Sequence, residues 1–297
     1  MRTFARAIAG KSFTITADIP LGSVASMDEA VQQAKDLAPW IDAVQMSANP
    51  EYPVQASPVA LAALLLREEI DPLVQLNCRD CNRLALQGDL IGLKAMGVSS
   101  LLLNRGNRLQ IPGVHTGKPV FDINCQQLIA MAAEISEEGP GGPGQEFMIG
   151  TSATVASPKA DWKAGMLTAR GRSGARFLLT QPCFSVPILK NFMQRLVDLR
   201  LTWNFAVVVT LAPLPGIENA RWQMDNARAT VVPKTLARAL SEAEDPRQAG
   251  IEHCARLMRE IAAIPGISGV NLLTLGDPAA VIEAISLSGL RQDGKGQ

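Results

Sequence analysis

The sequence predicts an α/β fold, a (β/α)8 TIM barrel that forms a single domain over residues 1–297, with residues 290–297 frayed. Eight short apolar runs alternate with longer stretches of helical spacing. Runs such as FAVVVTLA are apolar on both faces, as a parallel sheet covered by helices requires. A doubly wound open sheet is the alternative, but the first turn, DIPLGSVAS, lacks the G-x-G-x-x-G pattern often found there.

Each expected strand is followed by an expected helix. In chain order, the strands are predicted at residues 13–19, 43–47, 73–78, 99–105, 146–153, 176–181, 204–211 and 269–275. The helices are predicted at residues 27–40, 58–70, 83–96, 124–135, 159–172, 186–201, a longer region over 232–263, and 278–287. The Gly- and Pro-rich stretch SEEGPGGPGQ lies between a helix and a strand, so it is predicted to be a surface loop and not a linker between domains.

The composition disfavours several classes of protein. The formal net charge is +0, with 28 basic and 28 acidic residues, and aromatic residues are few, so neither an electrostatic nor a base-stacking nucleic-acid surface is expected. No apolar run reaches the roughly 18 residues of a membrane helix, and the first residues do not resemble a secretory signal. Five scattered cysteines, an odd number, indicate reduced thiols and therefore a cytoplasmic protein.

The active site of such a barrel lies at the carboxyl ends of its strands. The polar residues there contain one acid, Asp18, one base, Arg105, and no histidine, which suits hydrogen bonding to a large neutral heterocycle better than two-carboxylate hydrolysis. Gln181 is a second strong candidate, because an amide at the end of an apolar strand needs partners. The other candidates at strand ends are Ser47, Asn49, Asn77, Cys78, Asn104, Gly106, Asn107, Thr151, Ser152, Thr180, Pro213, Thr274 and Leu275.

Cys78 and Cys81 form a C-x-x-C pair at the end of the third strand. A zinc site would need two more ligands, and the remaining cysteines and both histidines are isolated or point in different directions, so no metal site is predicted. A redox pair is also disfavoured, because the rest of a thioredoxin pattern is missing. We interpret Cys78 as the end of the strand and Cys81 as a loop residue.

Three segments resemble one known family. Residues 78–107, CRDCNRLALQGDLIGLKAMGVSSLLLNRGN, residues 118–132, KPVFDINCQQLIAMA, and residues 177–184, FLLTQPCF, are similar to the methylenetetrahydrofolate reductase family, especially its short bacterial branch. Cys81 stands where that branch commonly has Arg, so the C-x-x-C pair arises from a substitution. The family fold is an eight-stranded barrel, as the pattern predicts independently.

The resemblance implies a flavin enzyme. FAD would lie across the strand ends, with a tetrahydrofolate derivative as the small-molecule substrate, and hydride transfer through the flavin would connect 5,10-methylenetetrahydrofolate and 5-methyltetrahydrofolate. Arg170 matches a family Lys near the FAD phosphates, and Gln181 matches the Gln that contacts the pterin. The remaining cofactor-binding residues would be Ser47, Gln75, Asn77, Arg105, Gly106 and Asn107. NAD(P)H as electron donor, a redox partner protein and a homo-oligomer remain open.

This sequence departs from the family at three positions. The family's general acid is a Glu at the end of the first strand; here the nearest carboxylate is Asp18, and a one-residue shift in alignment would put Ala17 there. The family acid that contacts the pterin and tunes the flavin is Asn107 here, and a family histidine is Gln75. We take Asp18 and Asn107 as the catalytic candidates. Losing a negative charge at Asn107 would raise the flavin potential and favour oxidation of 5-methyltetrahydrofolate.

Two other functions remain open. The chain could be a non-enzymatic or accessory barrel that binds folate or FAD, which the loss of acidic residues favours. It could also be a pterin methyltransferase, which would bind no flavin. Retention of Arg105, Gly106 and Gln181 favours the flavin oxidoreductase.

Overall fold

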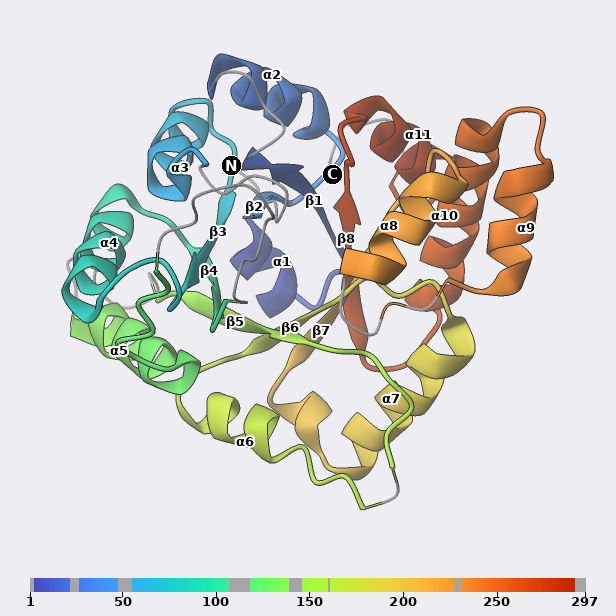
Figure 1. The fold of residues 1–297 in the computed structure, drawn as a ribbon. Coiled ribbons are helices and arrows are strands. Elements are labelled where there is room, and N and C mark those ends of the chain that lie inside the picture. The colour runs from blue at the N-terminus through green and yellow to red at the C-terminus, as the bar shows by residue number, and fades with distance from the viewer. Residues whose placement is uncertain are drawn as a thin grey trace.

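Eight parallel strands close into a barrel in chain order, with β8 paired to β1, so the predicted fold class is confirmed (Figure 1). The computed structural model describes residues 3–21, 27–47, 55–106, 118–138, 146–159, 161–226, 230 and 232–291. The strands are β1 Thr14–Pro20, β2 Ala43–Ser47, β3 Pro72–Asn77, β4 Ser100–Asn104, β5 Met148–Ala153, β6 Phe177–Thr180, β7 Ala206–Leu211 and β8 Ile267–Leu273.

Helices surround the barrel and cover its outer wall (Figure 1). The helices are α1 Phe4–Ala9, α2 Met27–Leu37, α3 Pro58–Arg67, α4 Arg83–Met96, α5 Cys125–Glu138, α6 Gly165–Arg172, α7 Val186–Asp198, α8 Ile217–Asn226, α9 Lys234–Glu242, α10 Pro246–Ala262 and α11 Pro278–Ser288, with a 3₁₀ turn, η2, at Leu201–Trp203. Within the described ranges, no helix is long and apolar enough to cross a membrane.

The structure corrects several predicted boundaries. Helices α1 and α8 were not predicted, and the region 232–263 is two helices, because Ala243 is extended and the Asp245 side chain caps α10 by accepting from the Gln248 N–H. Strand β7 begins at Ala206, because Asn204 caps η2 and the Phe205 N–H donates back to the Leu201 carbonyl at 3.0 Å. The frayed tail at residues 290–297 stays a prediction, because residues 292–297 lie outside the described residues; at its start, Arg291 donates to both carboxylate oxygens of Asp42, each at 2.9 Å.

The strands have an outer and an inner face because successive side chains point in opposite directions. On β1, Ile15, Ala17 and Ile19 belong to the large apolar cluster that also contains the buried residues of the surrounding helices. Thr16 and Asp18 therefore point into the barrel. This assignment decides which strand-end residues can reach a ligand.

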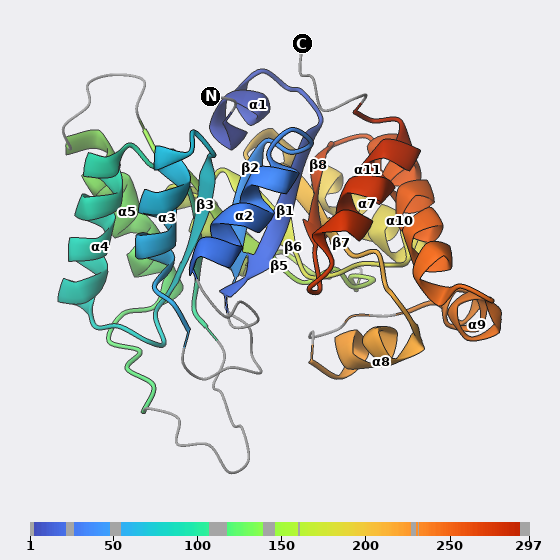
Figure 2. The same ribbon diagram turned by 90° about the horizontal axis from the view of Figure 1, so that it is seen from above.

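The amino-terminal end of the barrel is closed by an apolar floor. Phe4 of α1 meets Phe177 of β6 edge to face, with ring centroids 4.8 Å apart. Gly150 on β5 makes room for this ring, because a Cβ there would lie 2.2 Å from it. The other buried members of the floor are Ala43, Leu73, Leu102, Leu179 and Val208. Figure 2 shows α1 at one end of the barrel and α8 at the other.

Asp71, immediately before β3, holds α1 against the floor. Its carboxylate accepts hydrogen bonds from the Phe4 N–H at 2.9 Å and the Ser99 hydroxyl at 3.1 Å. The pKa of Asp71 is raised from its usual 3.8 to about 7, chiefly by burial and also by nearby Asp42, although both hydrogen bonds oppose the shift. The folded protein therefore binds a proton at Asp71 more readily than the unfolded chain does.

Replacing Asp71 with Asn should change how stability depends on pH. Because the folded-state pKa lies above the unfolded value, the wild-type free energy of unfolding should fall by up to about 4 kcal/mol as pH rises from about 4 to 8. Asp71→Asn, which mimics the protonated acid, should remove most of that decline and be the more stable protein at pH 8. Urea unfolding at pH 5 and pH 8 measures the difference; equal pH slopes for the two proteins would contradict this assignment.

Candidate functional site

A belt of inward-pointing polar side chains lines the upper half of the barrel, towards the carboxyl ends of the strands. Asp18 is level with Gln45 on β2 and with Leu273 on β8, and its side chain is only 4% exposed. Thr274, the residue after β8, donates from its hydroxyl to the Asp18 carbonyl at 2.9 Å. Ala17 points outward into the apolar cluster, so Asp18 is the residue of this pair that faces the site.

The turn after β4 contains the Arg105–Gly106 pair. Gly106 has φ +79°, and a Cβ there would lie 2.8 Å from both the Asn77 Oδ1 and the Arg79 Cβ. The Arg105 guanidinium lies 4.3 Å from the centre of the Phe121 ring, a cation–π contact that orients this cation. Phe121 itself has φ +45°, a strained value for a bulky residue. Asn107 lies outside the described residues.

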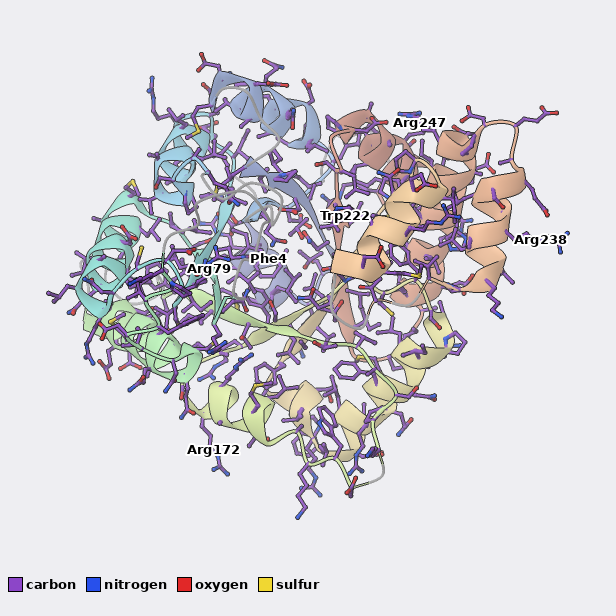
Figure 3. All side chains as sticks on the ribbon, in the orientation of Figure 1. Phe4, Arg79, Arg172, Trp222, Arg238 and Arg247 are labelled. Carbon is purple, nitrogen blue, oxygen red and sulfur yellow. The ribbon has the colours of Figure 1, made fainter. Side chains whose placement is uncertain are left out.

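Asn77 shapes the turn after β3. Its Oδ1 accepts from the Arg79 N–H at 2.9 Å, and its Nδ2 donates to the Asp80 carboxylate at 2.8 Å. Arg79, labelled in Figure 3, also donates to Asp80 at 2.8 Å. The side-chain amide of Asn77 is therefore used within the protein, so any contribution to ligand binding comes through the backbone it fixes. The side chain of Ser47, which ends β2, lies outside the described residues.

Arg170 on α6 and Gln181, the residue after β6, reach the same end of the barrel. The Arg170 Nη1 donates to the Thr151 hydroxyl at 2.9 Å and to the Ser152 carbonyl at 3.3 Å, which brings its guanidinium to the end of β5. The Gln181 N–H continues the sheet by donating to the Ala153 carbonyl at 2.9 Å. Its side chain is half-buried and makes no hydrogen bond with any other described residue, which leaves the amide available to a ligand.

The cysteines are poor candidates for chemistry. All five are free, and burial raises the pKa of the Cys78 thiol to about 11, with Cys125 adding to the effect. The Cys78 thiol donates to the Asn104 carbonyl at 3.5 Å. Burial also raises the pKa of Cys81, so both thiols of the C-x-x-C pair stay protonated at neutral pH. Among the described residues, no three His, Cys, Asp or Glu side chains are grouped as a metal site.

Two inner-wall amides were not among the predicted site residues. The Gln45 Nε2 donates to the Gln75 Oε1 at 3.3 Å, and the Asn271 Oδ1 accepts from the Thr16 hydroxyl at 2.7 Å. Both stand in otherwise apolar strand runs, AVQMS and GVNLL. The argument applied to Gln181, that a buried amide needs partners, would have found them.

The fold and the site define a class: an α/β barrel whose ligand site lies at the carboxyl ends of its strands. The sequence matches the methylenetetrahydrofolate reductase family over residues 22–289, and the chain belongs to that family. No curated protein matches it in sequence.

Solved structures show the same fold at low identity. An uncharacterised protein from Clostridium thermocellum, which binds two copies of 5-methyl-5,6,7,8-tetrahydrofolic acid, is 14% identical over 96% of each chain, with a TM-score of 0.57. A 2,3-dimethylmalate lyase of the PEP mutase/isocitrate lyase superfamily is 13% identical, with a TM-score of 0.51, over 98% of this chain and 86% of its own.

The Arg105–Gly106 turn depends on a glycine, so Gly106→Ala should destabilise it. The added methyl group would meet Asn77 and Arg79, and Ala is strained at this φ, so the free energy of unfolding should fall by about 1 kcal/mol or more. The matched control is Gly88→Ala in α4, where a Cβ meets nothing within 4 Å and Ala should stabilise by up to about 1 kcal/mol. Urea unfolding of the three proteins tests this, and equal stability of Gly106→Ala and wild type would refute it.

Proposed function

We propose that the protein is a flavin-dependent oxidoreductase that interconverts 5,10-methylenetetrahydrofolate and 5-methyltetrahydrofolate by hydride transfer through FAD, in the one-carbon metabolism of the cytoplasm. The observation that carries this proposal is the convergence of Asp18, the Arg105–Gly106 turn and Gln181 on one end of a barrel of this family. Binding of 5-methyltetrahydrofolate by the structural relative from Clostridium thermocellum supports the choice of substrate class.

The residues at the strand ends fit FAD. Gly106 lets the turn that carries Arg105 pack directly against Asn77 and Arg79 at the end of β3, where a Cβ would lie 2.8 Å from both residues. Arg105 and Arg170 supply two cations for the diphosphate, and each is already oriented by a contact within the protein. When bound, the flavin would supply the hydride chemistry, and NAD(P)H is our candidate for the electron donor.

The substrate would be held by hydrogen bonds from the inner wall. The free amide of Gln181 would pair with the edge of the pterin, which presents both donors and acceptors. Asp18 would hold the proton that opens the methylene bridge, because it is the buried carboxyl group that faces the site from β1. Aspartate is one methylene shorter than the family's glutamate, so the substrate would have to lie closer to β1.

The two roles can be separated by mutation. Gln181→Leu should raise the KM for the folate about tenfold or more while leaving the Kd of FAD unchanged, because only the pterin contact is lost. Asp18→Asn should lower kcat at least about 100-fold with a small effect on KM, since it removes the proton donor. Steady-state kinetics and FAD titration measure these effects.

Each contrary result points to a different conclusion. Unchanged turnover in Asp18→Asn would remove that residue from the mechanism. A wild-type protein that binds the folate but takes up no FAD would instead be a flavin-free folate barrel, either an accessory protein or a pterin methyltransferase.

We further propose that the enzyme is poised to oxidise 5-methyltetrahydrofolate. Asn107 stands where the family has an acid, and the missing negative charge would make the anionic reduced flavin easier to form. Asn107→Asp should therefore lower the flavin midpoint potential, measured by reductive titration of the bound flavin. A variant potential equal to or above that of the wild type would rule out this bias.

A further inference from the structure

Two buried amide side chains on the inner wall have polar atoms left over. Gln45 is 4% exposed and Asn271 is 1% exposed. Within the described residues, the Gln45 Oε1 and the Asn271 Nδ2 are buried and have no hydrogen-bond partner. Folded proteins rarely leave such atoms unsatisfied, and an ordered water is the usual partner where the protein supplies none.

The two atoms lie on either side of the same strand. In the sheet register, Gln45 on β2 is level with Asp18, and Asn271 on β8 is level with Thr16, one inward position lower on β1. Strands β2 and β8 both pair with β1, so their backbones are separated by two strand spacings of about 4.8 Å each. Both side chains point into the barrel, because their strand neighbours Val44, Met46, Val270 and Leu272 belong to the outer apolar cluster.

The chemistry of the two free atoms is complementary. The Gln45 oxygen needs a donor and the Asn271 nitrogen needs an acceptor, and a water molecule supplies both at once. Thr16 donates its hydroxyl proton to the Asn271 Oδ1 at 2.7 Å, so the oxygen of the same hydroxyl can still accept a hydrogen bond. Three polar partners match the number that a buried water typically has.

We infer that Gln45 and Asn271 bind an ordered internal water beside Thr16 and below Asp18, and that they act through it as positioning residues for the Asp18 carboxyl group. The water would complete a chain of hydrogen bonds from Gln75 through Gln45 to Asn271 and Thr16, since the Gln45 Nε2 already donates to Gln75. The water site stands on the geometry alone, whereas the positioning role rests on the function proposed for Asp18.

A double-mutant cycle tests the water site on the protein without flavin or folate. Gln45→Leu and Asn271→Leu should each lower the ratio of folded to unfolded protein about tenfold, because each releases the water. In the double variant this ratio should fall by a factor at least about fivefold smaller than the product of the two single factors, since the water can be lost only once. Losses that multiply to within about twofold would refute a shared water.

A matched control uses Thr180→Val together with Asn271→Leu. Thr180 is on β6, one strand removed from β8 as β2 is, and its hydroxyl oxygen already accepts from the Thr210 N–H at 3.0 Å. The decreases in the folded-to-unfolded ratio caused by Thr180→Val and Asn271→Leu should therefore combine as a simple product in the double variant. If a leucine variant fails to fold, nuclear Overhauser transfer from water to the Asn271 side-chain amide of the wild type decides the question: a long-lived water contact supports the site, and its absence refutes it.

The positioning role needs a separate readout. The pH profile of folate turnover should have a limb that Asp18→Asn abolishes. Asn271→Leu should shift the midpoint of that limb by about half a pH unit or more, whereas Thr180→Val should leave it in place. If the double-mutant cycle shows coupling but Asn271→Leu leaves the limb of the pH profile unmoved, the positioning role is overturned. A wild-type protein without folate turnover would overturn the proposed function and leave the water site supported by the cycle.

Discussion

Phe4 and Phe177 meet inside the amino-terminal end of the barrel, with their ring centroids 4.8 Å apart. This contact joins α1 to β6, and with the other apolar residues of the floor it closes the amino-terminal end of the barrel. Above this apolar floor, Thr16, Asp18, Gln45 and Asn271 form a buried polar belt on the inner wall, nearer the carboxyl ends of the strands. The position of the candidate site follows from that division of the interior.

Alternation along each strand then selects the residues that face the site. On β1 it directs Asp18 inward and Ala17 outward, which replaces an ambiguity of alignment with a geometric assignment. The turns above the strands are fixed before any ligand binds. The Asn77 side-chain amide is hydrogen-bonded to Arg79 and Asp80 of the next turn, and the Phe121 ring contacts the Arg105 guanidinium. Preorganisation of this kind lowers the entropy that binding must overcome.

The sequence predicted the barrel because its buried strands are apolar on both faces and its helices follow each of them. It did not predict α1, since six residues are too few to display a helical period, and it did not divide α9 from α10, although Asp245 and Pro246 form a cap and a first helical position. Predicted residues Asp18, Arg105 and Gln181 do lie at one end of the barrel. The hydrogen bonds of Asn77 within its turn and the bond between Gln45 and Gln75 depend on three-dimensional structure and strand register. Spacing along the chain does not contain that information.

The central claim is that this member of the methylenetetrahydrofolate reductase family moves a hydride between a folate and FAD. The most direct measurement is an anaerobic visible spectrum of the purified protein with FAD, recorded before and after 5-methyltetrahydrofolate is added. We predict that the absorption of the bound oxidised flavin is bleached and that 5,10-methylenetetrahydrofolate forms in equal amount. Bound flavin that stays oxidised with the folate present, or a protein that binds no flavin, would contradict the account.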